Sequence, residues 1–227
     1  VCSSDLFKLA AITEREDPRD AFVSNQYTSL QELPEGSIVG TSSLRRESQL
    51  RAQFPHLKVQ PLRGNVQTRL RKLDEGQYAA IILAAAGLKR LGLSDRITAL
   101  LDPEQSLPAV GQGALGIECR ADRDDLVQLL QPLHHMETAY CVEAERSMSR
   151  VLGGSCQVPL GAFAEIIDGT LQLRGFVAQP DGTRIVSDAL NGKPETGIKM
   201  GQELAEKLIK QGADEILASL VPAEGWK

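Results

Sequence analysis

The six consecutive apolar residues Ala79–Ala84 constrain the fold more than any other segment of the sequence. A continuous apolar run of this length is typical of a central strand that is covered on both faces. Strands are also expected at Ser37–Gly40 and Lys58–Leu62, with one helix starting at Thr41–Ser43 and another running from Asn65 to about Glu75. Strand and helix therefore alternate, which predicts an α/β layered domain with a mainly parallel sheet.

A different pattern begins after Gly153 and Gly154. Three further strands are expected there, at Ala162–Ile167, Thr170–Ala178 and Arg184–Leu190. The dipeptides Asp168-Gly169 and Asp181-Gly182 between them are strong hairpin signals, and an amphipathic helix is expected over residues 196–211. This part of the chain is therefore predicted to be α+β, with a three-stranded antiparallel sheet.

The remaining segments lie before, between and after these regions. A strand is expected at Phe7–Thr13, followed by a charged connector at Glu14–Asp20 in which Pro18 disfavours helix. The other expected elements are a short helix at Gly87–Gly92, a strand at Ala114–Cys119, and helices at about Asp124–Leu130 and His135–Arg150.

The composition is that of an ordinary globular protein. Hydrophobic residues make up 42% of the 227 residues and charged residues 24%, which excludes low-complexity and collagen-like chains. No apolar run approaches the ~20 residues that a membrane-spanning helix needs. The chain begins with Val1 rather than methionine, so we expect its true start to be missing.

Positive charge gathers in one window of an acidic chain. The net charge is −5, yet residues 41–96 contain eleven Lys and Arg against four acidic residues. Eight of these eleven cations are arginine, whose planar fork binds carboxylate or phosphate bidentately. The window therefore suggests recognition of planar anions, with a solvated surface as the alternative. Nucleic acid is a weaker candidate, because only 4% of the residues are aromatic.

Two expected strand-to-helix junctions lie within this window. Gly40–Arg46 brings three hydroxyls and two guanidiniums to one helix start, and Arg63–Asn65 repeats the arrangement at the next. Helix N-termini favour anions, and the carboxyl ends of parallel strands face one crevice. On the second helix Arg69 borders the expected buried stripe and is predicted to reach the crevice, whereas Arg71 is predicted to be a solvated surface charge.

The cysteines and histidines show no metal-binding pattern. They are Cys2, Cys119, Cys141 and Cys156, and His56, His134 and His135. Their spacing matches no zinc template, and the lack of a CxxC pair favours free thiols in a reducing compartment. Cys119 and Cys141 are expected to be inert, and the His134-His135 pair to cap or pack at a helix start. Cys156 lies in a glycine-flanked loop that can expose a reactive thiol, with a structural role as the alternative.

Five segments carry motifs in an order and spacing that point to one enzyme family. The segments are Glu14–Phe22, Gly40–Arg46, Leu62–Val66, Leu107–Ala114 and Gly153–Pro159. Together they resemble the porphobilinogen deaminases (hydroxymethylbilane synthases). The resemblance runs from about Phe7 to the C-terminus, whereas Val1–Leu6 does not fit it.

The resemblance implies three domains. Two periplasmic-binding-protein-like α/β domains enclose a cleft, and a small α+β domain carries the cofactor cysteine on a loop. By analogy, residues 19–107 form the second domain with its arginine-rich cleft, and residues 136–227 form the third. Residues 1–18 and 108–135 are then a remnant of the first domain together with hinge segments. We expect this remnant to be unstable, because one strand and one helix cannot bury a core alone.

The resemblance also implies an activity and a cofactor. Members of the family are cytoplasmic transferases of tetrapyrrole and heme biosynthesis that join four porphobilinogens into the linear hydroxymethylbilane, releasing ammonia. A dipyrromethane cofactor, attached through a thioether at the position of Cys156, primes the chain. The matching cofactor-binding residues are Ser43, Arg45, Arg46 and Arg69, and the matching substrate-binding residues are Arg63, Arg69 and Arg90. The family resemblance further implies a monomer with no nucleic-acid or membrane partner.

One catalytic residue of the family has no counterpart in this sequence. The general acid/base is an aspartate in a segment that would precede Val1, and Asp17, Asp20 and Asp102 do not match it. We therefore expect the 227-residue chain to be a fragment that is inactive alone. A second interpretation is a non-enzymatic, small-anion-binding module of periplasmic-binding-protein type. It would use the same two helix N-termini and would need no special cysteine.

Overall fold

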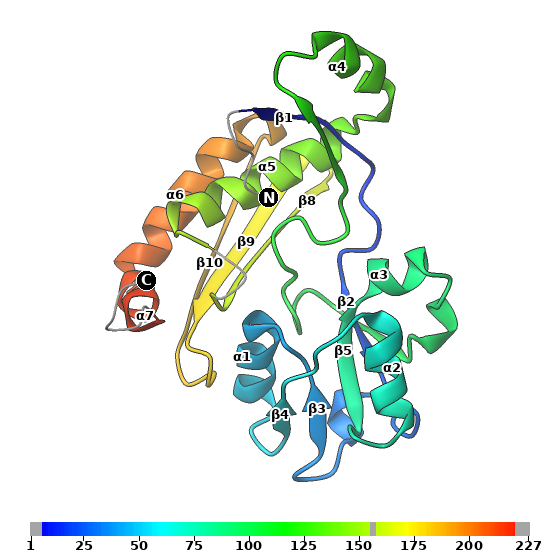
Figure 1. Cartoon of the computed structure of the whole chain (residues 1–227). Coiled ribbons are helices and arrows are strands. Elements are labelled where there is room, and N and C mark those ends of the chain that lie inside the picture. Colours follow the sequence, from blue (N-terminus) through cyan, green and yellow to red (C-terminus); the bar gives the residue numbers. More distant parts are fainter. Residues whose placement is uncertain (1–5, 155–157, 221–227) are drawn as a thin grey trace.

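The computed structural model describes residues 6–154 and 158–220, whose strands form three sheets (Figure 1). The largest sheet has five strands in the order β4-β3-β5-β2-β6. These strands are β2 (Asp20–Val23), β3 (Ile38–Gly40), β4 (Lys58–Gln60), β5 (Ala80–Ala84) and β6 (Ala99–Leu101). The helices between them are η1 (Leu30–Glu32), α1 (Leu44–Gln53), α2 (Val66–Asp74), α3 (Ala85–Arg90) and η2 (Ser94–Arg96).

Strand β5 occupies the centre of this sheet and is covered on both faces, as its apolar run predicts. Ile82 packs into a cluster with Phe22 and Leu50. Its neighbours Ile81 and Leu83 point into a different cluster that includes residues of α2 and α3. Because successive side chains of a strand point to opposite faces, the sheet lies between two hydrophobic layers.

The prediction of a mainly parallel sheet holds for four of the five strands, since only β2 runs in the opposite direction. β3 runs parallel to β4 and β5, but β2 runs antiparallel to both β5 and β6. The expected charged connector ends earlier than predicted, since Asp20 is the first residue of β2 and is buried completely. Strands β2 and β6 have only four and three residues, and, unlike β3 and β4, neither is followed by a capped helix that marks its end in the sequence.

The second sheet is antiparallel, with the order β10-β9-β8, and confirms the predicted three-stranded meander. Its strands are β8 (Leu160–Ile167), β9 (Thr170–Ala178) and β10 (Ile185–Gly192). The helices α5 (Met136–Val151), α6 (Gly197–Lys210) and α7 (Ala213–Leu220) accompany it, with η4 (Pro194–Thr196). Met148 of α5 and Leu204 of α6 pack on Leu171 and Leu173 of β9, so these two helices cover one face of the sheet (Figure 1).

The third sheet is a two-stranded ribbon of β1 (Phe7–Ile12) and β7 (Gly116–Arg120), paired antiparallel. It leads into α4 (Asp124–Leu130) and η3 (Gln131–Leu133), and α4 has no buried residue. The chain segments that follow β1 and precede β7 continue side by side, since Thr13 and Glu16 donate backbone hydrogen bonds to Leu115 and Gly113. This pair of segments connects the ribbon to the five-stranded sheet.

The predicted helix starts are largely confirmed. Ser43 accepts a hydrogen bond from the Arg46 amide and caps α1, and the side chain of Asn65 caps α2. His135 caps α5, as expected of the histidine pair. The short helix predicted at Gly87–Gly92 begins two residues earlier, at Ala85. Among the described residues, no helix has the length and hydropathy required to cross a membrane.

Candidate functional site

The two strand-to-helix junctions are joined to each other directly. The backbone amide of Thr41, after β3, donates to the carbonyl of Gln60 at the end of β4. The amide of Leu62 donates to the Ser42 hydroxyl over 3.0 Å. Gly40 is required where β3 ends, because a Cβ there would lie 2.8 Å from the Tyr78 ring. The hydroxyls of one junction and the backbone of the other therefore form one surface, as the sequence predicts.

Arg45 and Arg46 at the start of α1 share a single carboxylate, that of Asp20. Arg45 donates to both carboxylate oxygens, at 2.9 and 3.1 Å. Arg46 donates to Oδ1 through Nε and Nη2, at 2.9 and 2.7 Å. The Ser106 hydroxyl and the Gln112 amide complete the set at 2.7 and 3.0 Å. Two guanidiniums on one carboxylate leave a net positive charge at this helix N-terminus.

Asp20 is thereby held in its ionised form. Burial alone would raise the pKa of Asp20, but the charges and hydrogen bonds of Arg45 and Arg46 hold it well below the usual range. A carboxylate that is saturated with donors cannot exchange a proton with a substrate near neutral pH. Asp20 therefore holds Arg45 and Arg46 in position, whereas the sequence analysis assigned it to the charged connector. The sequence signal for its pairing is the two consecutive arginines after a helix cap.

Arg69 lies close enough to Arg46 for their charges to repel each other. Burial, and then the positive charge of Arg46, lowers the pKa of Arg69. Its Nε donates to the carbonyl of Gly64 at 2.8 Å, and no described acidic side chain forms an ion pair with it. Arg71, two residues later, is exposed and pairs with Glu75, in agreement with its predicted surface role. An anion near Arg46 and Arg69 would relieve this repulsion.

The other two candidate arginines are more dispersed. Arg63 is exposed, and its backbone carbonyl accepts a hydrogen bond from Lys72. Arg90 is exposed at the end of α3 and donates to the carbonyl of Gly113 at 2.6 Å. The structure therefore groups Ser43, Arg45 and Arg46, with Arg69 beside them, whereas the hydrogen bonds of Arg63 and Arg90 are with residues outside this group.

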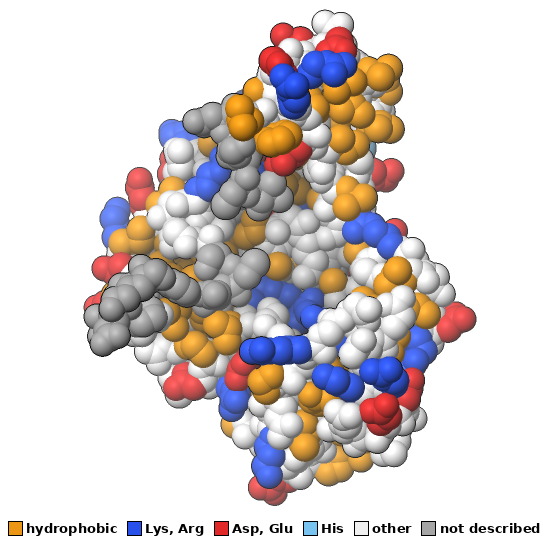
Figure 2. Space-filling model, viewed as in Figure 1, with side chains coloured by type: hydrophobic (Ala, Val, Ile, Leu, Met, Phe, Trp, Pro, Cys, Tyr) orange, Lys and Arg blue, Asp and Glu red, His pale blue; other side chains and the backbone are white. Residues whose placement is uncertain are grey.

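A cleft with a volume of about 810 Å³ opens beside the start of α1. Ser42, Ser43 and Arg45 line one side, while Arg146 and Arg150 of α5 contribute further guanidiniums. Figure 2 shows Lys and Arg side chains within a hollow of the viewed face. Ligand pockets for small molecules have roughly 300–1,000 Å³. The cleft is therefore large enough for a ligand of several rings, and Arg146 and Arg150 were not found by sequence reasoning.

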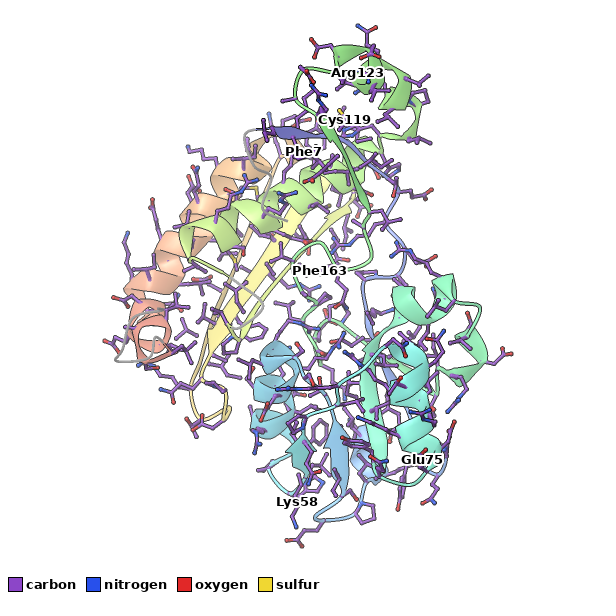
Figure 3. The ribbon with its side chains drawn as sticks, viewed as in Figure 1. Phe7, Lys58, Glu75, Cys119, Arg123 and Phe163 are labelled. Carbon is purple, nitrogen blue, oxygen red and sulfur yellow. The ribbon has the colours of Figure 1, made fainter. Side chains whose placement is uncertain are left out.

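The cysteine loop reaches the same cleft at both of its described ends. Gly154 and Val158 belong to the cleft lining. Cys156 itself, the candidate attachment residue, lies outside the described residues. Cys119 and Cys141 are buried, which agrees with the expectation that their thiols are inert. The Cys119 sulfur lies 4.0 Å from the carbonyl oxygen of Arg123, and Figure 3 labels both residues. Burial, reinforced by the charge of Glu145, raises the pKa of the Cys141 thiol to about 12.

A second buried ion pair joins the connector after β1 to the three-stranded sheet. Arg15 pairs with Glu145 of α5 at 2.6 Å, and the Glu145 carboxylate also accepts the amides of Gly111 and Ala164. The Arg15 guanidinium lies 5.1 Å from the centre of the Phe163 ring, which Figure 3 labels between the two larger sheets. The pair thus fixes both connecting segments to α5 and β8.

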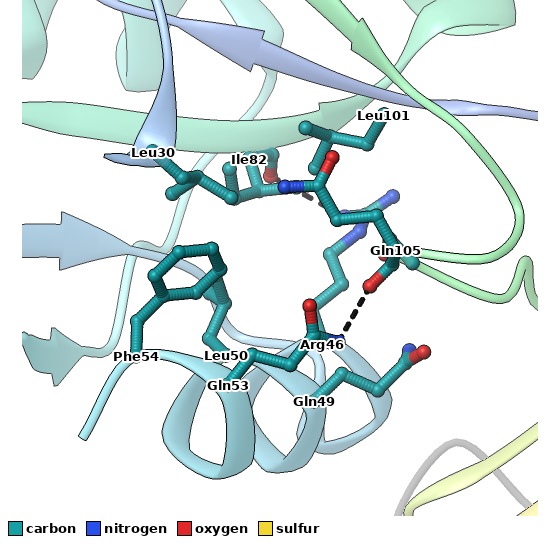
Figure 4. A pocket seen from close by; sticks show the side chains of 10 residues that line it. Leu30, Arg46, Gln49, Leu50, Gln53, Phe54, Ile82, Leu101 and Gln105 are labelled. Atoms are coloured by element: carbon teal, nitrogen blue, oxygen red, sulfur yellow. Dashed lines mark hydrogen bonds between the residues drawn. The ribbon is translucent and has the colours of Figure 1, made fainter. Parts of the chain in front are cut away.

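A smaller pocket behind α1 is not a ligand site. Its volume is about 10 Å³, and Leu30, Phe54 and Leu101 are among its apolar lining residues (Figure 4). Such a space holds roughly one water molecule. Arg46 borders the pocket and donates to the Ile82 carbonyl at 3.4 Å. The residues around the pocket therefore help to hold the Arg46 side chain in place.

Comparison with known proteins identifies the family. Residues 2–128 match the family model described as "Porphobilinogen deaminase, dipyromethane cofactor binding domain". Residues 139–210 match "Porphobilinogen deaminase, C-terminal domain", and Cys156 falls within this second match. The first match begins at residue 2, so the expectation that Val1–Leu6 lies outside the resemblance is wrong for residues 2–6.

Two relatives cover most of the chain. The porphobilinogen deaminase of Nitrosomonas europaea is 73% identical over 94% of this chain and 70% of its own length. That of Methylobacillus flagellatus is 67% identical, over 94% of this chain and 69% of its own length. Among solved structures, a YaeC-family lipoprotein from Enterococcus faecalis has a TM-score of 0.39 and 18% identity, with 64% of this chain and 66% of that chain covered. This likeness is too weak to test the periplasmic-binding-protein-like architecture.

These matches agree with the motifs and with the arginine-lined cleft. The relatives are named porphobilinogen deaminase, which is a transferase (hydroxymethylbilane synthase) of tetrapyrrole and heme biosynthesis. The cofactor of the matched domain is dipyrromethane. The chain belongs to the porphobilinogen deaminase family.

Proposed function

We propose that this chain holds a growing pyrrole oligomer, tethered to Cys156, against the arginines at the start of α1 and α2. The observation that carries the proposal is the shared position of two groups on one cleft. Ser43 and Arg45 line one part of its wall, and Gly154 and Val158, which flank the cysteine loop, line another. An oligomer attached to this loop would extend toward a helix N-terminus with excess positive charge.

The residues suit the chemistry of the ligand. Each pyrrole carries an acetate and a propionate, so an elongating chain accumulates carboxylates that arginine binds well. Arg46 and Arg69 repel each other, which favours an anion beside them. Arg45 and Arg46 are both engaged with Asp20 and contribute positive potential rather than a free fork, whereas the Arg69 side chain donates only to the Gly64 carbonyl among the described residues. Ser43 offers a hydroxyl at the cleft, and Arg63 and Arg90 remain candidates for incoming porphobilinogen.

Dipyrromethane supplies the first pyrrole positions to which four porphobilinogens are added, giving hydroxymethylbilane and ammonia. The part of this chain is to bind and orient the carboxylates of that oligomer. We assign residues 19–107 to the second domain of the family and residues 136–227 to the third. We also infer a cytoplasmic monomer whose small-molecule partner is porphobilinogen.

Substitution of the paired arginines tests this function. Arg69→Leu should weaken the binding of porphobilinogen, measured by titration calorimetry at low salt, by at least about tenfold (~1.4 kcal/mol). Arg71→Leu is the matched control, because Arg71 lies on the same helix but is exposed and pairs with Glu75. Equal affinities for the two variants would contradict the assignment of Arg69.

We further propose that the 227-residue polypeptide alone does not complete the reaction. Asp20, the carboxylate beside the arginines, is saturated by six donated hydrogen bonds and so cannot act as the acid/base. Purified chain supplied with porphobilinogen should form no hydroxymethylbilane, whereas the enzyme of Nitrosomonas europaea serves as the positive control. Product formed by the 227-residue chain would refute this statement.

The alternative of a non-enzymatic anion-binding module uses the same helix N-termini. It explains the arginine group but gives no role to Cys156. Family membership favours the enzyme. The alternative predicts that Cys156→Ser changes neither the anions that the protein binds nor the affinity with which it binds them.

A further inference from the structure

The turn between β9 and β10 packs directly on the backbone of α1. A Cβ on Gly182 would lie 2.6 Å from the carbonyl oxygen of Ser48 and 2.7 Å from the amide nitrogen of Ala52. The Cβ of Arg51 would be 3.1 Å away. No side chain fits between this turn and the helix, so the three-stranded sheet touches α1 through a bare glycine.

The other hairpin turn of the same sheet offers a direct comparison. Gly169, between β8 and β9, has φ +73°, and Gly182 has φ +74°. Both therefore adopt the left-handed conformation that favours glycine. A Cβ on Gly169 would meet nothing within 4 Å. The left-handed conformation explains why both turns carry a glycine. Of the two glycines, only Gly182 also contacts α1.

The docked turn lies at the same end of the sheet as the exit of the cysteine loop. Leu160, the first residue of β8, pairs with Val177 near the end of β9. The amide of Ala178 donates to the carbonyl of Pro159 at 2.9 Å. Cys156 precedes Pro159 by three residues in the sequence. A short hydrogen-bonded path therefore leads from the exit of this loop to the turn.

On the other side, the contact lies one turn of helix from the arginines. Ser48 donates its hydroxyl to the carbonyl of Arg45 at 3.1 Å, and Gln49 donates its amide to the same carbonyl. Arg45 and Ser48 are buried on the same side of α1. Because a helix moves as a rigid element over this length, displacement at Ser48 would also displace Arg45 and the start of α1.

We propose that Gly182 is a positioning residue, whose close contact with α1 sets the distance between the arginine group and the cysteine loop. This inference rests on the proposed function of those two groups. It adds that their spacing is fixed by a contact between elements far apart in the sequence.

The variants Gly182→Ala and Gly169→Ala separate this role from turn stability. Both add one methyl group to a left-handed glycine and should lower the unfolding midpoint in urea. Gly182→Ala should lower it more, because its methyl group would also lie within 2.7 Å of backbone atoms of α1. Porphobilinogen affinity, measured by calorimetry in a Cys156→Ser background to keep binding reversible, should fall about tenfold (~1.4 kcal/mol) in Gly182→Ala and stay unchanged in Gly169→Ala. Hydrogen exchange of the α1 amides should be faster only in Gly182→Ala.

The outcomes distinguish this inference from the proposed function. Equal affinity and equal α1 exchange in the two variants would overturn the positioning role of Gly182. The proposed function fails instead if protein made in cells that supply porphobilinogen carries no dipyrromethane at Cys156. The exchange comparison then still decides whether the turn holds α1, with faster exchange in Gly182→Ala alone supporting the contact.

Discussion

At the residue scale, the buried carboxylate of Asp20 decides how the arginine group is arranged. Arg45 is 4% exposed and could not remain buried and charged without this partner. The carboxylate also accepts hydrogen bonds from the side chains of Ser106 and Gln112, which lie in the segment after β6. One residue thus links β2, α1 and the segment that leads to the cleft.

Asp20→Asn should destabilise the protein strongly. Loss of one partner of a buried ion pair leaves the other charge uncompensated, which costs about 3–5 kcal/mol. Urea unfolding followed by circular dichroism measures the change. Asp74→Asn is the control, since Asp74 forms a more exposed ion pair with Arg96 and its loss should cost at most ~1 kcal/mol. Equal losses of unfolding free energy in the two variants would contradict the structural role assigned to Asp20.

Stability should fall below about pH 4 because Asp20 and Asp17 have lowered pKa values. A carboxyl whose folded-state pKa lies below its unfolded value stabilises the fold while it is ionised. That contribution is complete above the unfolded pKa and disappears as the pH falls toward the folded one. Urea midpoints measured from pH 6 to pH 2 should decrease, and Asp20→Asn should flatten the decrease. A wild-type midpoint that stays constant over this range would contradict the pairing.

Cys141 should resist alkylation in the folded protein. Its pKa of about 12 leaves almost no thiolate at pH 8, and its side chain is buried. Peptide mapping after iodoacetamide treatment at pH 8 should find Cys141 unmodified in native protein and modified in urea. Rapid modification of native protein would show that the thiol is accessible.

At the element scale, α1 and α2 have equivalent caps but different surroundings. Ser43 accepts from the third residue of α1, and Asn65 does the same for α2. These caps follow from sequence because a short polar side chain before a helix satisfies an amide that would otherwise have no partner. What the sequence does not reveal is that only Ser43 lines the cleft.

Ser43→Ala and Asn65→Ala should therefore have equal costs in stability and different costs in binding. Each loss of a cap costs about 1 kcal/mol, measured by urea unfolding. Only Ser43→Ala should also weaken porphobilinogen binding. If both variants bind equally, the Ser43 hydroxyl serves the helix alone.

The elements that sequence reasoning found are those with a local signal. β5 has its apolar run, the hairpins have Asp-Gly turns, and α1 and α2 have caps. Strands β2 and β6 lack such a signal, since their places in the sheet depend on pairing between residues that are 58 to 81 positions apart in the chain. For the same reason, the antiparallel entry of β2 and the Asp20 pairing could not be predicted from local pattern.

At the scale of the whole molecule, the Arg15–Glu145 pair ties the connecting segments to α5 and β8. The Glu145 carboxylate accepts from Arg15 and from the amides of Gly111 and Ala164. The ribbon of β1 and β7 has little core of its own, and α4 beside it buries no residue. The attachment of this ribbon therefore depends on its connectors.

Glu145→Gln should loosen these connectors before the sheets unfold. A neutral amide leaves the Arg15 charge buried and unpaired, at a cost of about 3–5 kcal/mol. Limited trypsin digestion should then cut within residues 114–130 faster than in the wild type. Unchanged protection of this segment would contradict the role of the pair.

The central claim is that an oligomer with acidic side arms is tethered at Cys156 and reaches the arginines across the cleft. Intact mass spectrometry and peptide mapping of protein expressed in cells that make porphobilinogen test it most directly. The account predicts a dipyrromethane adduct on the peptide that contains Cys156, lost in Cys156→Ser and reduced in Arg46→Leu. An unmodified thiol at Cys156, or an adduct at a different cysteine, would contradict it.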